Sequence, residues 1–294
     1  MPWLQIKARI TDAEAPQMEQ LFQSIGAVSV TLLDAEDEPV FQLDPGSTPL
    51  WQQTLLCALF EDDADADAII ATVTAGSRLL ESDLLTEKIA DQDWERAWMS
   101  DFRPMRFGER LWVCPSWSEP PEPDAVNIML DPGLAFGSGT HPTTALCLAW
   151  LDSQQLTNKS VIDYGCGSGI LAIAAALLGA NRVVAVDNDP QAVTASGNNR
   201  DMNGISAGLM TVHLPGEAHA PADIVVANIL SGPLAELTPV LTSLTKPGGK
   251  LILSGVLSEQ TETLMASYAP FFAMQAPVIQ DEWVRIEGTR LTGN

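Results

Sequence analysis

The sequence predicts an α/β protein in two parts, and three observations support this prediction. The chain has 294 residues, of which 46% are hydrophobic, enough for a large core and about two domains. Beyond about residue 126, short aliphatic runs alternate with helical patterns, which indicates a parallel, doubly wound sheet. The first ninety residues show a different order, in which two of the four strands follow one another without a helix between them. We therefore expect a small domain over 1–90, a linker over 91–124 and a larger domain over 125–294.

The predicted N-terminal domain has the order β-α-β-β-α-β, the ferredoxin-like α+β plan. Residues 2–9 alternate between apolar and polar side chains, as a half-buried strand does. Residues 13–25 carry apolar side chains at helical spacing, and Gly26 is a suitable helix stop. The other expected elements are strands over 28–33, 54–60 and 84–89, a helix over 63–77, and an acidic, Pro- and Gly-rich loop over 36–49.

The predicted C-terminal domain alternates strands and helices. Strands are expected over 160–164, 182–187, 209–214, 223–228 and 250–255, and helices over 168–178, 190–202, 232–244 and 258–268. The tail offers two more strands, over 271–279 and 283–290, with no helix between them. We expect these two to form an antiparallel hairpin at the sheet edge, so that the sheet has seven strands.

The linker is unusually rich in tryptophan. It holds four of the eight tryptophans, at positions 94, 98, 112 and 117, and ends in a Pro-rich stretch. We expect these rings to pack between the domains, with substrate binding as the alternative.

The formal charge of −23 is concentrated in the first 95 residues, which hold 19 acidic and 4 basic side chains. Duplex nucleic acid would be repelled by such a field, whereas a basic protein would be attracted. Alternatively, the acidic surface only keeps the protein in solution.

Composition also favours a cytoplasmic protein. The chain has no run of about 18 apolar residues that would span a membrane and no signal-peptide pattern at its start. Its four cysteines form no C-x-x-C pair, which favours reduced thiols over disulfides or a zinc site. We therefore expect no bound metal.

The strongest local motif is a glycine-rich turn, Val161-Ile-Asp-Tyr-Gly-Cys-Gly-Ser-Gly-Ile-Leu171. Glycines let the backbone approach a ligand closely, and the helix that follows offers free N–H groups. Dinucleotide enzymes usually have G-x-G-x-x-G spacing at this turn. The G-x-G-x-G spacing found here, preceded by Asp163, instead resembles the cofactor loop of S-adenosylmethionine-dependent methyltransferases. Many α/β folds, however, use such a turn only to reverse the chain.

Polar side chains end two further predicted strands. Asp187 follows Gly165 by 22 residues and could accept hydrogen bonds from both ribose hydroxyls. Helix capping is the alternative role, but Asp189 before Pro190 already suits it. Asn228 could orient an amine through its side-chain carbonyl, or cap the next helix. No aromatic ring follows Asn228, which disfavours a planar amide or nucleobase and leaves an aliphatic amine.

The most distinctive segment is Asp131-Pro-Gly-Leu-Ala-Phe-Gly-Ser-Gly-Thr-His-Pro-Thr-Thr144. Glycines around Phe136 predict a loop that could close over the methionyl part of the cofactor. Pro142 suits the first position of a helix, which places Thr144 in its first turn. His141 is interpreted as a cap or structural residue, with general base as the alternative.

Together these motifs resemble the bacterial ribosomal protein L11 methyltransferase family. The resemblance extends to Pro2-Trp-Leu-Gln-Ile, Asp93-Trp-Glu-Arg-Ala-Trp98 and Asn228-Ile-Leu, so it covers essentially the whole chain. The family often has Thr where this chain has Ser138, a conservative difference.

The resemblance implies a Rossmann-like, seven-stranded methyltransferase domain and an N-terminal domain that recognises the ribosomal protein. It implies trimethylation of lysine side chains and of the N-terminal α-amine of L11, with S-adenosyl-L-methionine as cofactor. Cofactor contacts would fall on Thr144, Gly165, Gly167, Asp187, Asn228 and Phe136, and Asn228 would also be the catalytic residue. We expect no direct contact with nucleic acid or membrane.

Three alternatives stay open at this stage. The enzyme could methylate another protein or a small amine. A nicotinamide-dependent dehydrogenase would share the doubly wound sheet, but the glycine spacing and Asn228 disfavour it. A non-catalytic protein that keeps the cofactor fold is disfavoured by the intact loop and Asp187.

Overall fold

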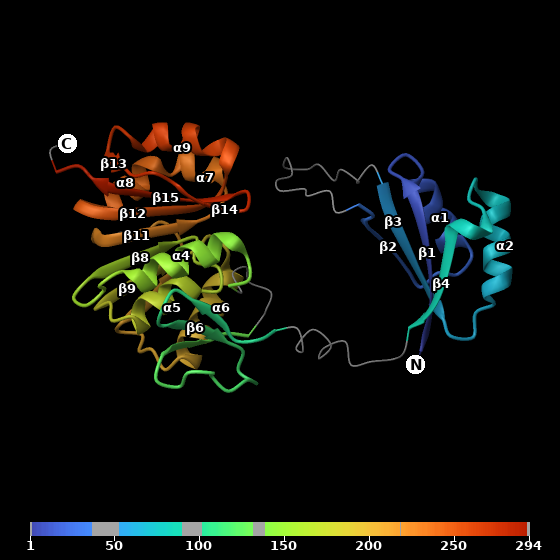
Figure 1. Cartoon of the computed structure of the whole chain (residues 1–294), viewed down its shortest axis with the longest axis horizontal. Helices are drawn as coiled ribbons and strands as arrows, with labels where there is room; N and C mark the ends of the chain where they lie inside the picture. The colour runs from blue at the N-terminus through green and yellow to red at the C-terminus, as the bar shows by residue number, and fades with distance from the viewer. Residues whose placement is uncertain (1, 37–52, 90–101, 132–138, 218, 293–294) are drawn as a thin grey trace. The chain divides into compact units, whose positions relative to one another are not determined.

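The computed structural model describes residues 2–36, 53–89, 102–131, 139–217 and 219–292 (Figure 1). The chain divides into two compact units, Met1–Met99 and Ser100–Asn294.

The first unit has the predicted ferredoxin-like order. Its elements are β1 (Trp3–Thr11), α1 (Ala15–Ser24), β2 (Ser29–Asp34), β3 (Gln53–Glu61), α2 (Ala66–Gly76), the short helix η1 (Glu81–Asp83) and β4 (Leu84–Ile89). The strands form an antiparallel sheet in the order β2-β3-β1-β4. Alternate residues of β1, from Leu4 to Ile10, are buried against Met18 and Phe22 of α1 and Val73 of α2. One face of the sheet therefore carries the core of this unit.

The second unit contains the predicted doubly wound sheet. Its strands are β8 (Ser160–Tyr164), β9 (Arg182–Val186), β10 (Met210–His213), β11 (Ala222–Asn228), β12 (Thr245–Leu257), β13 (Phe272–Met274), β14 (Val278–Gln280) and β15 (Trp283–Arg290). Their order is β10-β9-β8-β11-β12-β15-β13, with β14 also beside β15. The first five are parallel, and β15 runs antiparallel to β12. The carboxyl ends of the parallel strands thus meet at one edge.

Helices cover both faces of this sheet (Figure 1). They are α4 (Pro142–Ser153), α5 (Ile170–Leu177), α6 (Pro190–Met202), α7 (Ser231–Glu236), α8 (Thr238–Leu244), the short helix η3 (Ser258–Gln260) and α9 (Thr261–Tyr268). Neighbouring residues of each central strand face opposite cores: Val161 packs with α4 and α5, whereas Ile162 packs with α7, α8 and α9. Burial on both faces explains why these strands are almost wholly aliphatic.

Proline accounts for two differences from the predicted boundaries. The expected helix 232–244 is divided at Leu237 into α7 and α8, because Pro239 lacks an N–H and its ring clashes with the preceding turn. The expected strand 271–279 is divided into β13 and β14. Pro277 lies in the interruption and cannot donate to the sheet ladder.

The stretch predicted as a linker contains ordered strands. β5 (Met105–Phe107) and β6 (Leu111–Cys114) form a small sheet with β7 (Val126–Met129). Phe107 and Leu111 join the core against α4 and α5, so this sheet belongs to the second unit. Trp112 in β6 and Trp117 in the stretch after it are both half-buried. Trp94 and Trp98 lie outside the described residues, so packing of the tryptophans between domains stays a prediction.

A polar cluster joins the amino ends of three central strands. The Asp223 carboxylate accepts hydrogen bonds from the backbone N–H of Ser160 at 2.9 Å, from its hydroxyl at 2.6 Å and from Lys246 Nζ at 2.8 Å. Partial burial alone would raise the pKa of Asp223. The hydrogen bonds from Lys246 and Ser160 outweigh it and hold the pKa well below the usual range.

We predict that Asp223→Asn lowers the free energy of unfolding by about 1–3 kcal/mol at neutral pH, the scale of hydrogen bonds to a charged group. The carboxyl has a lower pKa in the folded than in the unfolded protein. Its stabilisation is therefore complete above about pH 4 and is lost as the pH falls toward the folded-state value. Urea unfolding of both proteins across this range measures the difference, and a difference that does not shrink in acid would contradict the assignment.

Candidate active site

The glycine-rich loop joins β8 to α5 at the carboxyl edge of the sheet. Gly165, Gly167 and Gly169 all have positive φ, at 80°, 53° and 81°. A Cβ on Gly165 would lie 2.2 Å from Cγ2 of Ile229, the residue after β11. Glycine is thus required at position 165 both for its conformation and for the close approach of two loops.

Buried polar groups hold this loop from beneath. Asp163 is 1% exposed, and its carboxylate accepts a 3.0 Å hydrogen bond from the backbone N–H of Ala172 in α5. Burial raises the pKa of Asp163 to about 7, with a smaller contribution from the Asp187 carboxylate, although the hydrogen bond opposes the rise. From α6, Ser196 Oγ donates to the Gly167 carbonyl at 2.9 Å and Asn199 Nδ2 donates to the Ser168 carbonyl at 2.8 Å.

The two residues of α6, Ser196 and Asn199, were not among the predicted site residues. Ser196 and Asn199 are three positions apart, so they lie on one face of the helix. A hydroxyl and an amide side chain three positions apart on one helix face could have indicated that this face binds another polar segment. Their partners, the Gly167 and Ser168 carbonyls, are about 30 residues away in the sequence and could not be predicted from local spacing.

Asp187 lies directly beside the glycine loop. Its Oδ2 accepts a 2.8 Å hydrogen bond from the Gly167 N–H, and its Oδ1 accepts one at 3.0 Å from the Asp189 N–H. Asp189 caps α6 by accepting from the Gln191 N–H at 2.8 Å, as its position before Pro190 predicts. Asp187 is half-buried, and each carboxylate oxygen can accept a further hydrogen bond. Ribose binding by Asp187 stays a prediction.

Asn228 and Thr144 meet although 84 residues separate them. Asn228 ends β11, and its Nδ2 donates a 3.2 Å hydrogen bond to Oγ1 of Thr144 in the first turn of α4. Because the amide nitrogen faces Thr144, the carbonyl oxygen Oδ1 faces elsewhere. That oxygen is buried and has no hydrogen-bond partner among the described residues. An unpaired buried acceptor is costly, so Oδ1 is suited to receive an N–H group from a ligand.

His141 caps α4, as the sequence analysis favoured. Its Nδ1 lies 2.8 Å from Oγ1 of Thr143 and accepts from the Thr143 N–H at 3.4 Å. Its ring packs edge-on against Trp283, with centroids 4.7 Å apart. Burial lowers the pKa of His141, which favours the neutral ring that can accept these hydrogen bonds.

The remaining expectations concern Phe136, a bound metal, a membrane span and the cysteines. Phe136 lies outside the described residues, so its contact with the cofactor stays a prediction. Across the described ranges, no group of three or more His, Cys, Asp or Glu side chains could hold a metal ion. Within the same ranges, no helix is long and apolar enough to cross a membrane. All four cysteines are free thiols in buried positions.

Comparison with known proteins identifies the family. The family model for "Ribosomal protein L11 methyltransferase (PrmA)" matches residues 2–291. Proteins of that name from Azotobacter vinelandii and Pseudomonas fluorescens are 56% and 55% identical over 293 residues, covering 99% of this chain and 100% of each relative. A crystal structure of ribosomal protein L11 methylase from Lactobacillus delbrueckii subsp. bulgaricus is 32% identical with a TM-score of 0.58, over 65% of this chain and 100% of that one. The chain therefore belongs to the PrmA family of ribosomal protein L11 methyltransferases.

Proposed function

We propose that this methyltransferase uses S-adenosylmethionine to trimethylate lysine side chains and the N-terminal α-amine of ribosomal protein L11. The observation that carries the proposal is the buried, unpaired Oδ1 of Asn228 at the carboxyl end of β11. Ligands of open α/β sheets bind in the crevice at this edge. An amine N–H is the group that this oxygen can accept.

The described residues fit the cofactor. The glycine loop joins β8 to α5 at the carboxyl edge of the sheet, and the half-buried Asp187 carboxylate lies beside it with capacity for further hydrogen bonds. Gly165 and Gly167 would hold the cofactor beside Asp187, which would bind its ribose, and Thr144 and Phe136 would lie on the methionyl side. Bound S-adenosylmethionine supplies an electrophilic methyl group on a positively charged sulfur.

The chain's own contribution is to align a neutral amine. A free lysine has a pKa of about 10.4, so only a small fraction is neutral at pH 7. A desolvated slot favours the neutral form, whereas a carboxylate beside the amine would favour the ammonium ion. Asn228 accepts the amine N–H through an uncharged carbonyl, so it orients the nucleophile without holding its proton. Thr144 fixes the direction of that carbonyl by occupying the amide nitrogen.

We assign recognition of the ribosomal protein to the N-terminal domain predicted over 1–90, and catalysis to the second unit, which contains the predicted domain 125–294 and the small sheet β5-β6-β7. Ribosomal proteins are mostly basic, and the net charge of −15 over residues 1–95 would attract them. The four buried thiols accord with a reducing cytoplasm, where we place the enzyme.

Asp187→Ala is expected to weaken S-adenosylmethionine binding by about 1.5–3 kcal/mol, because hydrogen bonds to a charged group are lost. Asp189→Ala is the matched control. It removes the same charge two residues away and a helix cap worth about 1 kcal/mol, but should leave cofactor affinity unchanged. Calorimetric titration measures both. Equal affinities for Asp187→Ala and the control would remove Asp187 from the site.

Mass spectrometry of L11 incubated with the enzyme and S-adenosylmethionine tests the function itself. We expect added methyl groups on lysine residues and on the N-terminal amine. Asn228→Ala should slow turnover by about tenfold or more, the equivalent of one well-aligned hydrogen bond, while cofactor affinity changes little. Unmodified L11 in the presence of enzyme that binds the cofactor would contradict the proposed substrate. Collapsed cofactor affinity with normal turnover of the bound complex would contradict the role of Asn228.

A further inference from the structure

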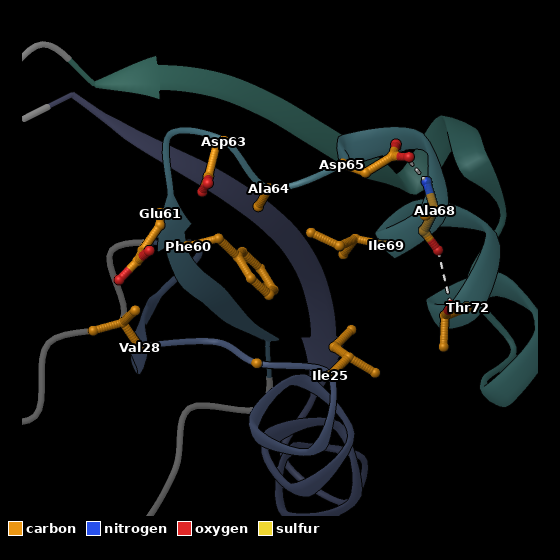
Figure 2. Close-up of a pocket in the computed structure, with 11 residues that line it drawn as sticks. Ile25, Val28, Phe60, Glu61, Asp63, Ala64, Asp65, Ala68, Ile69 and Thr72 are labelled. Carbon is orange, nitrogen blue, oxygen red and sulfur yellow. Dashed lines mark hydrogen bonds between the residues drawn. The ribbon is translucent and has the colours of Figure 1, made fainter.

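A groove in the first unit is separate from the cofactor loop. It has a volume of about 470 Å³ and lies between the end of β3, the start of α2 and the turn after α1 (Figure 2). Two stretches far apart in the sequence line it: residues 25–28, which include Ile25, and residues 60–72, which include Phe60 and Ile69. No step of the proposed reaction uses this groove.

The floor of the groove is apolar. Phe60 and Ile69 are 2% and 8% exposed, and in Figure 2 both side chains point into the groove from facing elements. Val28 at the edge is 57% exposed, so it adds apolar surface beside the floor. Gly26 leaves the wall open, since a Cβ built there would meet no atom within 4 Å. The groove therefore has room for an inserted apolar side chain.

The rim of the groove is acidic. Glu61, Asp63 and Asp65 line it, and no Lys or Arg is among the lining residues. The Asp65 carboxylate is occupied, since it accepts a 3.1 Å hydrogen bond from the Ala68 N–H at the start of α2. The Glu61 and Asp63 carboxylates form no hydrogen bond or ion pair within the described part of the chain. By contrast, Asp62, which lies between them in the sequence, is not a lining residue, and its carboxylate pairs with Lys88 Nζ at 3.1 Å.

We propose that this groove docks a basic, amphipathic segment of the protein substrate. One apolar side chain would pack on Phe60 and Ile69, and flanking Lys or Arg side chains would pair with Glu61 and Asp63. The charge of the rim favours this occupant, because the unpaired carboxylates attract Lys and Arg side chains and repel acidic ones. The inference rests on the proposed function, in which the substrate is a basic ribosomal protein.

A second cavity in the same unit provides a matched control. It has a volume of about 420 Å³, but Arg78 and Glu14 both line it, so its rim carries charges of both signs. Ala68 and Ala75 are exposed residues of α2 that line the groove and the second cavity, respectively. Replacing either with tryptophan fills one cavity and leaves the other open.

Steady-state methylation of L11 tests the proposal. Glu61→Gln with Asp63→Asn should raise KM for L11 by about three- to tenfold at moderate salt and weaken its salt dependence, since rim charges act mainly on association. Ala68→Trp should raise KM by about tenfold without a change of charge, because it blocks an apolar anchor site. The turnover number at saturating L11 and the affinity for S-adenosylmethionine should not change. Controls are Ala75→Trp and the pair Glu19→Gln with Glu81→Gln, whose positions lie outside the groove.

Two outcomes would overturn the proposal. One is that both groove variants keep KM within about twofold of their controls. The other is that Ala68→Trp disrupts self-association in sedimentation analysis and leaves KM unchanged, which would make the groove a contact between copies of the chain. Either result leaves the proposed function intact, because turnover at saturating L11 reports on that separately. Absence of any L11 methylation by the unaltered enzyme would instead contradict the proposed function.

Discussion

The hydrogen bond from Asn228 Nδ2 to Thr144 Oγ1 is the interaction on which the proposed chemistry depends. The Asn228 amide has a donor, Nδ2, and an acceptor, Oδ1, and Thr144 binds the donor. The buried acceptor Oδ1 is left without a partner among the described residues, and under the proposed function this neutral carbonyl would orient an amine without stabilising its protonated form. A carboxylate at the same position would attract the ammonium ion, which cannot act as a nucleophile.

Close packing of backbones determines where this pair lies. The segment after β11 is confined between two glycines, since a Cβ would approach Ile229 to 2.2 Å from Gly165 and to 2.4 Å from Gly255. Both glycines also have positive φ, at 80° and 85°. Substitution at either would therefore move the end of β11 and Asn228 with it. The packing of the glycine loop against Ile229 thus helps to position Asn228 as well as the proposed cofactor site.

Local signals made much of this architecture predictable. Aliphatic runs revealed the central strands because burial on both faces leaves few other residue types. Asp189 before Pro190 predicted the cap of α6. The order of strands and helices in the first unit was predicted from the periodicity of its apolar residues. The breaks at Pro239 and Pro277 were not predicted, although the missing N–H of each proline is a local signal for them.

Contacts between segments that lie far apart in the sequence could not be predicted. The small sheet β5-β6-β7 has short strands whose apolar residues are buried only because α4 and α5 cover them. Ser196 and Asn199 look like ordinary helix residues until the loop that they hold lies against them. Thr144 was marked as a site residue by its motif, but its partner in the structure is Asn228 and could not be read from spacing.

A double-mutant cycle on Thr144 and Asn228 tests the central claim most directly. Turnover of L11 would be measured at saturating cofactor and substrate for Thr144→Val, Asn228→Ala and the double variant, with Thr144→Ser as the variant that keeps the hydroxyl. If Thr144 acts as a positioning residue through Asn228, Thr144→Val lowers turnover by about tenfold, Thr144→Ser restores it, and the double variant is no slower than Asn228→Ala alone. Independent, multiplying effects of the two substitutions would contradict the account.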